Sequence, residues 1–264
     1  GRTFSFFFLR LCRLTGCPTS SCNSLLPPFH RLALALTLSI CYTIGGMNNE
    51  RQTYFDENKR IEAVFADVQE AAATLAKAHL SGPVATRYLA QALVAVSLAA
   101  ENLSAGRETL SLRADFSPSP LDGFLVEATA EGTLRGYTKK KILEEFDGIS
   151  RPSDIQALGK GGTFAFIRSL PGKIVSSGVV RLETAKRGTI ALALEAYFAE
   201  SLQRRAKVAI LAEVDDEGEL SSARGVKIEC LPDGDPDAFE AVELSPRALA
   251  ASPRTILKKA GIPR

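Results

Sequence analysis

A chain of 264 residues, with 45% hydrophobic and 23% charged residues, has the composition of an ordinary globular protein. Its net charge of +2 comes from Arg2, Arg10, Arg13 and Arg31, because the first 46 residues hold no acidic residue and the remainder carries 28 basic and 30 acidic residues. This near-neutral body argues against a nucleic-acid-binding protein, which would concentrate positive charge on one face.

Residues 1–46 form a leader that has three interpretations. Its apolar run, residues 32–44, is shorter than the roughly 20 residues that span a bilayer, but it is compatible with the core of a signal peptide. The acid-free, Arg- and Ser-containing leader also fits a transit peptide. In the third interpretation, Met47, the only methionine, is the true start. We favour Met47 as the start and a cytoplasmic protein; organelle targeting or export is the alternative if the leader is genuine.

Two helical patterns open the body of the chain. In residues 58–80, Ile61, Val64, Phe65 and Val68 fit one helical face, although the β-rich first half of this stretch also fits a strand. A second helix is expected to begin at Pro83, a residue that suits the first helical turn. Since it is apolar nearly all round but contains charged residues, a buried core helix is favoured over a membrane span.

The rest of the body alternates between strand pairs and one helix. Apolar and polar residues alternate over residues 109–116, and hairpins are expected around the turns at 131–132 and 171–172. An amphipathic helix follows over residues 188–205, and a last strand pair flanks the acidic turn at 215–219. This order of elements predicts an α+β fold with antiparallel β-sheets and packed helices.

The stretch "LGKGGTFAF", residues 158–166, has the glycines and the lysine of a phosphate-binding loop but not their spacing. In a Walker loop, four residues separate the first glycine from Gly-Lys-Ser/Thr, and a helix must follow. Here Lys160 precedes Gly161, and a strand-like run follows Thr163. We therefore interpret this stretch as a turn between strands, with no phosphate bound.

Metal-ligating residues are concentrated in the leader. Of the five cysteines, only Cys230 lies in the body, and the spacing of the leader cysteines matches no common zinc motif. The two histidines are His30 and His79. We expect neither a metal nor another cofactor in this chain.

Several strings in a fixed order resemble the heat-shock protein 33 family of redox-regulated chaperones. The resemblance runs from about Tyr54 to Val242 and comprises "AQALVAVSLAAE", "GFLVEATAEGTLRGYTK", "LGKGGTFAF", "SSGVVRLE", "LEAYFAESLQRRAKVAILAEV" and "GVKIECLPD". It implies a first strand in "RIEAVFADV", a helix from near Gln69, and a compact N-terminal chaperone domain that tends to form dimers. It also implies a core domain over residues 47–244, with residues 245–264 beginning a linker.

Two departures from the family pattern affect function. The acidic residue of the family's Ser-Glu-Gln is replaced by Leu202. Family members also carry a C-terminal zinc module of four cysteines, whose oxidation releases the metal; this chain as given holds no such cysteines after Cys230. The sequence-based expectation is therefore that the redox switch is missing here.

The resemblance implies an ATP-independent holdase, a non-enzymatic chaperone that binds unfolded client proteins through apolar surface and prevents their aggregation. Candidate client-binding residues are Leu249, Ile256 and Leu257, in a segment broken by prolines. The alternative for Ile256 and Leu257 is packing on the domain's own core. A homodimer is possible, and neither nucleic acid nor a membrane is expected as a partner. The alternative functions are a structural or dimerisation remnant, a fragment of a full chaperone, or an enzyme acting on phosphate compounds.

Overall fold

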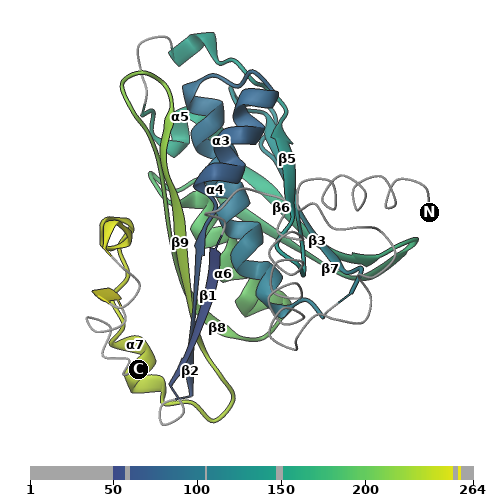
Figure 1. Ribbon diagram of the computed structural model, residues 1–264, viewed down its shortest axis with the longest axis vertical. Helices are drawn as coiled ribbons and strands as arrows, with labels where there is room; N and C mark the ends of the chain where they lie inside the picture. Colours follow the sequence, from purple (N-terminus) through teal and green to yellow (C-terminus); the bar gives the residue numbers. More distant parts are fainter. Residues whose placement is uncertain (1–49, 57–59, 105, 147–150, 252–254, 257–264) are drawn as a thin grey trace, which may run out of the picture. The chain divides into compact units, whose positions relative to one another are not determined.

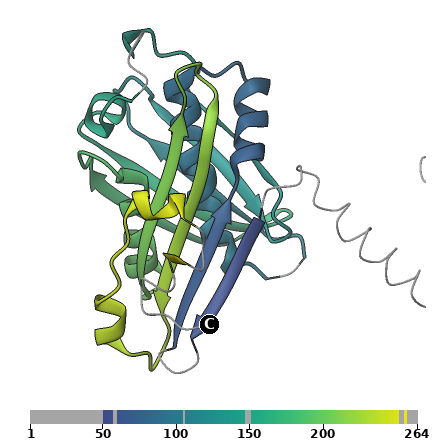
Figure 2. The same ribbon diagram turned by 60° about the vertical axis from the view of Figure 1, so that its left-hand side comes forward.

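The computed structural model describes residues 50–56, 60–104, 106–146, 151–251 and 255–256. The leader, residues 1–46, and the expected start at Met47 lie outside these residues. Within the described part, two antiparallel sheets enclose a central helix, as Figures 1 and 2 show.

The four-stranded sheet, here called sheet A, has the strand order β1-β2-β9-β8. Every neighbouring pair is antiparallel. Its strands are β1 (Glu50–Asp56), β2 (Ile61–Asp67), β8 (Arg205–Val214) and β9 (Leu220–Cys230). The hairpin β1–β2 is thus joined to the hairpin β8–β9, far along the chain, by the pairing of β2 with β9.

The five-stranded sheet, sheet B, has the order β5-β4-β3-β6-β7 and is also fully antiparallel. Its strands are β3 (Thr109–Asp115), β4 (Gly123–Thr129), β5 (Leu134–Thr138), β6 (Gly161–Leu170) and β7 (Lys173–Glu183). Both expected hairpins, β4–β5 and β6–β7, are present.

Helix α4 (Pro83–Ala99) lies between the two sheets, and this position accounts for its mostly apolar sequence. It contacts β2, β8 and β9 of sheet A and β3, β4 and β5 of sheet B. A helix with a sheet on either side must be apolar on nearly its whole circumference. Gly225 of β9 faces this helix, and a Cβ there would lie 2.3 Å from a methyl carbon of Val94, so the close approach requires glycine.

The other long helices pack around this centre. Helix α3 (Gln69–Ala78) lies against α4, and α6 (Thr189–Ser201) contacts α4, β7 and β8. The short helices are η1 (Ala100–Asn102), η2 (Glu144–Phe146), α5 (Asp154–Leu158), α7 (Pro236–Glu240) and η3 (Pro246–Ala250). No helix of the described residues has the length and apolar character needed to cross a membrane.

Most of the sequence-based elements are confirmed, and two are corrected. Ile61, Val64 and Phe65 lie in a strand and not on a helical face. The strand expected in "RIEAVFADV" is β2, and the helix expected from near Gln69 is α3. The glycine-rich stretch leads into a sheet strand, as the resemblance implies, but the element before it is the short helix α5, capped by Ser153, and not a strand. Gly159, at φ +74°, ends that helix, and Gly161 begins β6.

A partly buried ion pair, between Glu108 and Arg168, connects the start of sheet B to β6. Both carboxylate oxygens of Glu108 accept hydrogen bonds from the Arg168 guanidinium, at 2.5 and 2.7 Å, and the amide of Ser104 donates to the same carboxylate at 2.7 Å. Hydrogen bonding from Arg168 is the main cause that lowers the pKa of Glu108. The pair therefore ties the loop before β3 to β6.

Glu108→Gln is expected to lower the free energy of unfolding by about 1.5–3 kcal/mol, because the charge-assisted hydrogen bonds are lost. Since the folded-state pKa of Glu108 is depressed, its contribution is present above the pKa of the unfolded chain and is lost as the pH falls through the folded-state pKa. Urea denaturation of both proteins at neutral and acidic pH measures this. Equal losses of stability on acidification in both proteins would contradict it.

Candidate functional site

The outer face of sheet A, the one turned away from α4, is an apolar surface built by strand alternation. Side chains on one face of a strand are two residues apart, so β2 contributes Ile61, Ala63 and Phe65 to this face, and β9 contributes Val226 and Ile228. The remaining members from the strands are Tyr54, Ala209, Leu211 and Cys230. These residues form a second core cluster, separate from the one around α4.

A segment from the C-terminal part of the chain covers this face. We call residues 236–251 and 255–256 the C-terminal strap; it contains α7 and η3 and runs along the outer side of sheet A (Figure 2). Its buried apolar side chains are Phe239, Val242, Leu249 and Ile256, each at most 4% exposed. The strap therefore substitutes for a third layer at the sheet.

The strap begins with a polar attachment to the edge strand β8. The Lys207 ammonium donates to the carbonyl oxygens of Glu240 at 2.8 Å and Val242 at 3.0 Å, and it lies 3.5 Å from the Glu240 carboxylate. Arg205 forms an ion pair with the same carboxylate. Both cations also lie over the Phe239 ring, at 5.1 Å for Lys207 and 5.3 Å for Arg205.

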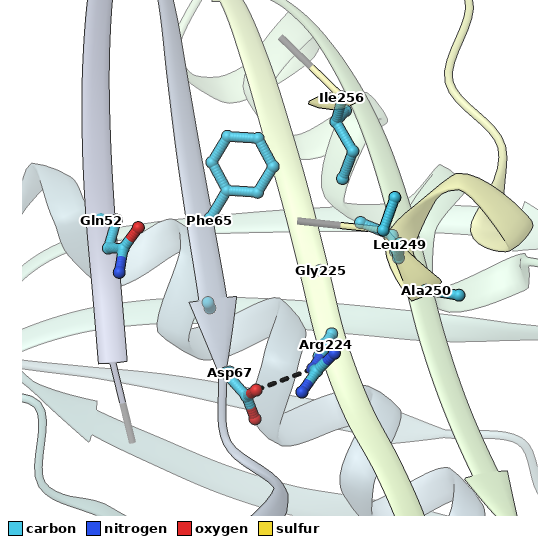
Figure 3. A pocket seen from close by; sticks show the side chains of 10 residues that line it. Gln52, Phe65, Asp67, Arg224, Gly225, Leu249, Ala250 and Ile256 are labelled. Atoms are coloured by element: carbon cyan, nitrogen blue, oxygen red, sulfur yellow. Dashed lines mark hydrogen bonds and ion pairs between the residues drawn. The ribbon is translucent and has the colours of Figure 1, made fainter. Parts of the chain in front are cut away.

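Further along, the strap and the sheet enclose a pocket of about 360 Å³ (Figure 3). Phe65 and Gln52 form its sheet side, and Leu249 and Ile256 form its strap side. A hydrogen-bonded ion pair between Asp67 and Arg224, at 2.7 Å, borders it.

The candidate client-binding residues from the sequence are placed as follows. Leu249 and Ile256 point into the second core cluster and are buried, whereas Leu257 lies outside the described residues. In this arrangement Leu249 and Ile256 reach a client only if the strap moves. Sequence reasoning missed Phe239, Val242 and the sheet residues beneath them; β2 gave no signal for its outer face, because its side chains are apolar on both faces.

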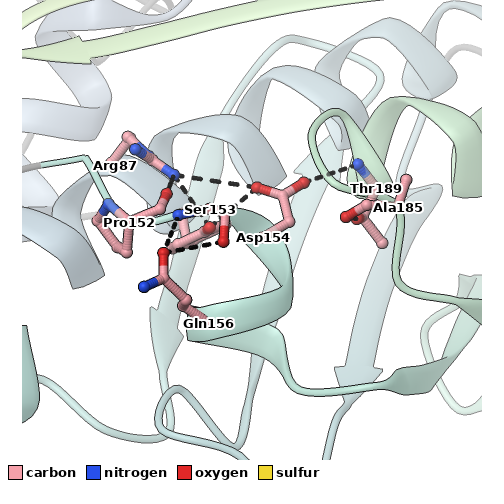
Figure 4. A network of polar contacts seen from close by, with 8 residues as sticks. Arg87, Pro152, Ser153, Asp154, Gln156, Ala185 and Thr189 are labelled. Carbon is pink, nitrogen blue, oxygen red and sulfur yellow. Dashed lines mark hydrogen bonds and ion pairs between the residues drawn. The ribbon is translucent and has the colours of Figure 1, made fainter.

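A second polar cluster, around Asp154, is structural (Figure 4). The buried Asp154 carboxylate accepts hydrogen bonds from the Tyr88 hydroxyl and from the amide of Thr189, both at 2.9 Å. Burial raises the pKa of Tyr88, and the nearby Asp154 carboxylate raises it further. Thr189 is the first residue of α6, so the carboxylate satisfies a free amide at that helix start. The cluster thereby joins α4, α5 and α6.

The glycine-rich loop is shaped by packing. A Cβ at Gly162 would lie 2.2 Å from the Phe116 ring, which explains the glycine there. Lys160 is exposed, and its carbonyl oxygen accepts a hydrogen bond from the amide of Thr184 at 2.9 Å. Among the described residues, no three His, Cys, Asp or Glu side chains are grouped as metal ligands would be.

Comparisons with known proteins agree on one family. The family model described as "Hsp33 protein" matches residues 50–260. Curated relatives named "33 kDa chaperonin" include one from Thermus thermophilus, 31% identical over 62% of this chain and 48% of the relative, and one from Citrifermentans bemidjiense, 31% identical over 72% and 62%. The chain thus spans about half to three-fifths of the length of these relatives.

A solved structure shows the same fold. It is that of a 33 kDa chaperonin from Thermotoga maritima, described as a heat shock protein 33 homolog. The similarity has a TM-score of 0.68 and 21% sequence identity, and it covers 81% of this chain and 75% of that one. With a family model that matches most of the described residues, the chain belongs to the Hsp33 protein family.

Proposed function

We propose that this chain is a holdase chaperone, which binds unfolding client proteins on the outer face of sheet A and does so without ATP. The observation that carries the proposal is an extended apolar sheet face that, among the described residues, is covered by the C-terminal strap alone. Each Å² of apolar surface withdrawn from water is worth about 25 cal/mol, so an uncovered face of this kind binds apolar segments of other chains.

The short helices of the strap support the proposal that it can detach from sheet A. Its two helical pieces, α7 and η3, have five residues each. Helices this short are not stable by themselves and depend on tertiary contacts. The strap is also joined to the body at one described end, after β9, so it can leave the sheet without disrupting any strand pair.

A heat-labile enzyme that aggregates on warming tests this function. The chain is expected to suppress light scattering by the client, to the same extent with and without ATP. For the 264-residue chain, the sequence-based expectation is also equal suppression in reducing buffer and in peroxide, with zinc added in neither. No suppression under any condition would contradict the holdase function, and suppression only after peroxide would contradict the expectation of a missing switch.

A second apolar surface is an alternative candidate for binding clients. Four large ones on the β6–β7 hairpin are more than two-fifths exposed: Leu170, Ile174, Val175 and Val179. We favour the outer face of sheet A because its apolar residues are contiguous across four strands and are covered by a segment that can detach. The hairpin is the surface against which the proposal has to be tested.

Homodimer formation, which the resemblance implies, is also a proposal. β7 is an edge strand of sheet B, and an exposed edge offers unpaired backbone groups to a second copy. Sedimentation of the chain and of Val179→Lys tests this site. A dimer that persists unchanged in the variant would place the contact elsewhere.

A further inference from the structure

The strap covers the outer face of sheet A, the surface proposed to bind clients. The side chains with which it contacts that face therefore indicate which client segments fit there. Its start joins an aromatic and an acidic residue: Phe239 is buried against the sheet, and the Glu240 carboxylate next to it is 57% exposed at the rim. The sheet therefore contacts this pair in two ways, with apolar surface below Phe239 and with cations around Glu240.

The two cations have no acidic residue opposite them within sheet A. In the β8–β9 register, Lys207 lies opposite Ile228, and Arg205 lies opposite Cys230. The ion pairs described for both cations are made with Glu240 of the strap. When the strap leaves, an apolar face is exposed whose β8 rim is positively charged, and the hydrogen bonds of Lys207 to the carbonyl oxygens of Glu240 and Val242 are lost.

We infer that the uncovered face selects client segments in which a large apolar or aromatic residue adjoins a carboxylate. Such a segment restores both the apolar contact and the charge pairing that the strap provides. A segment with lysine in place of the carboxylate brings a third cation to the rim and is disfavoured. This inference rests on the proposed function, since it names the class of segment bound at the same site.

Labelled peptides with the strap's own sequence provide the test. The parent peptide is PDAFEAVELSPRALAA, residues 236–251, and two others carry Gln or Lys at the position of Glu240. Their affinities for the full chain carrying Leu249→Ser, which weakens the strap's apolar contact, are measured by fluorescence anisotropy. The unaltered chain serves as a second protein, because competition by its own strap lowers all three affinities by one factor and leaves their ratios unchanged.

The Glu peptide is expected to bind about threefold more tightly than the Gln peptide and about tenfold more tightly than the Lys peptide, as for a partly exposed ion pair. Adding Lys207→Met and Arg205→Met should bring the Glu-to-Gln ratio close to one. The matched pair Lys173→Met and Lys186→Met, which removes two exposed cations elsewhere, should leave it at about threefold.

The outcomes separate this inference from the proposed function. Equal affinities for the three peptides, or a Glu preference that survives loss of Lys207 and Arg205, would overturn the charge preference and leave the apolar surface as the client site. If no peptide binds either protein, the outer face of sheet A is not a binding surface, and both proposals fail.

Discussion

Lys227→Ala is expected to lower the free energy of unfolding by about 3 kcal/mol, because the buried Glu229 carboxylate loses one of two cationic partners and keeps Arg204, at 3.1 Å. Lys227 and Glu229 are both 0% exposed, and the ammonium lies 2.8 Å from the Glu229 carboxylate and 3.6 Å from that of Glu62. The ammonium also lies 4.7 Å from the Phe198 ring centroid. Urea denaturation followed by circular dichroism measures the loss.

Two further variants show whether the loss comes from the broken ion pair. Lys173→Ala removes an exposed lysine of β7 and should change the stability by less than about 0.5 kcal/mol. In Lys227→Met combined with Glu229→Gln, most of the loss should be recovered, because no carboxylate is then buried at this position with fewer cationic partners than in the unaltered chain. A Lys227→Ala protein as stable as Lys173→Ala would show that the buried pair does not stabilise β9.

Release of the strap is the second large effect expected. Leu249→Ser combined with Ile256→Ser removes two of the strap's four buried apolar side chains from the second core cluster. The exposed sheet face should then raise the fluorescence of an apolar dye severalfold and suppress client aggregation at a lower ratio of chaperone to client. The main urea transition should change little, because the strap opens locally before the sheets unfold.

The matched control changes the same residue types on exposed positions. Leu192→Ser combined with Ile174→Ser removes one leucine and one isoleucine that are 45% and 65% exposed. This protein should bind the dye no more than the unaltered chain does. A strap variant that behaves like this control would mean that the strap does not limit access to sheet A.

The sequence alone was sufficient for elements whose burial leaves one clear pattern in the amino-acid sequence. Helix α4 is apolar on all sides because it lies between two sheets, and this is visible in its composition. The strand β2 is harder, because both of its faces are buried: Ile61, Ala63 and Phe65 face the strap, while Val64 and Ala66 face α4. A strand buried on both faces loses its alternation and can be mistaken for part of a helix; the family resemblance, and not the periodicity, gave the correct assignment.

The strap and β1 could not be predicted from local patterns. The strap's apolar residues, among them Phe239, Val242 and Leu249, are spaced irregularly and interrupted by prolines, since a sheet built from distant strands fixes their positions. β1 carries mostly polar side chains and is a strand because β2 pairs with it along its whole length. In both cases a contact with residues distant in the sequence determines the structure, and such a contact leaves no periodic pattern in the local sequence.

Methyl NMR of the full chain with an unfolding client tests the central claim most directly. With isoleucine methyl groups labelled, Ile61 and Ile228 report on the outer face of sheet A, Ile256 on the strap, and Ile174 on the competing β6–β7 hairpin. We expect the client to shift or broaden the signals of Ile61, Ile228 and Ile256 and to leave that of Ile174 unchanged. A response confined to Ile174, with the three others unaffected, would contradict the assignment of sheet A as the client-binding surface.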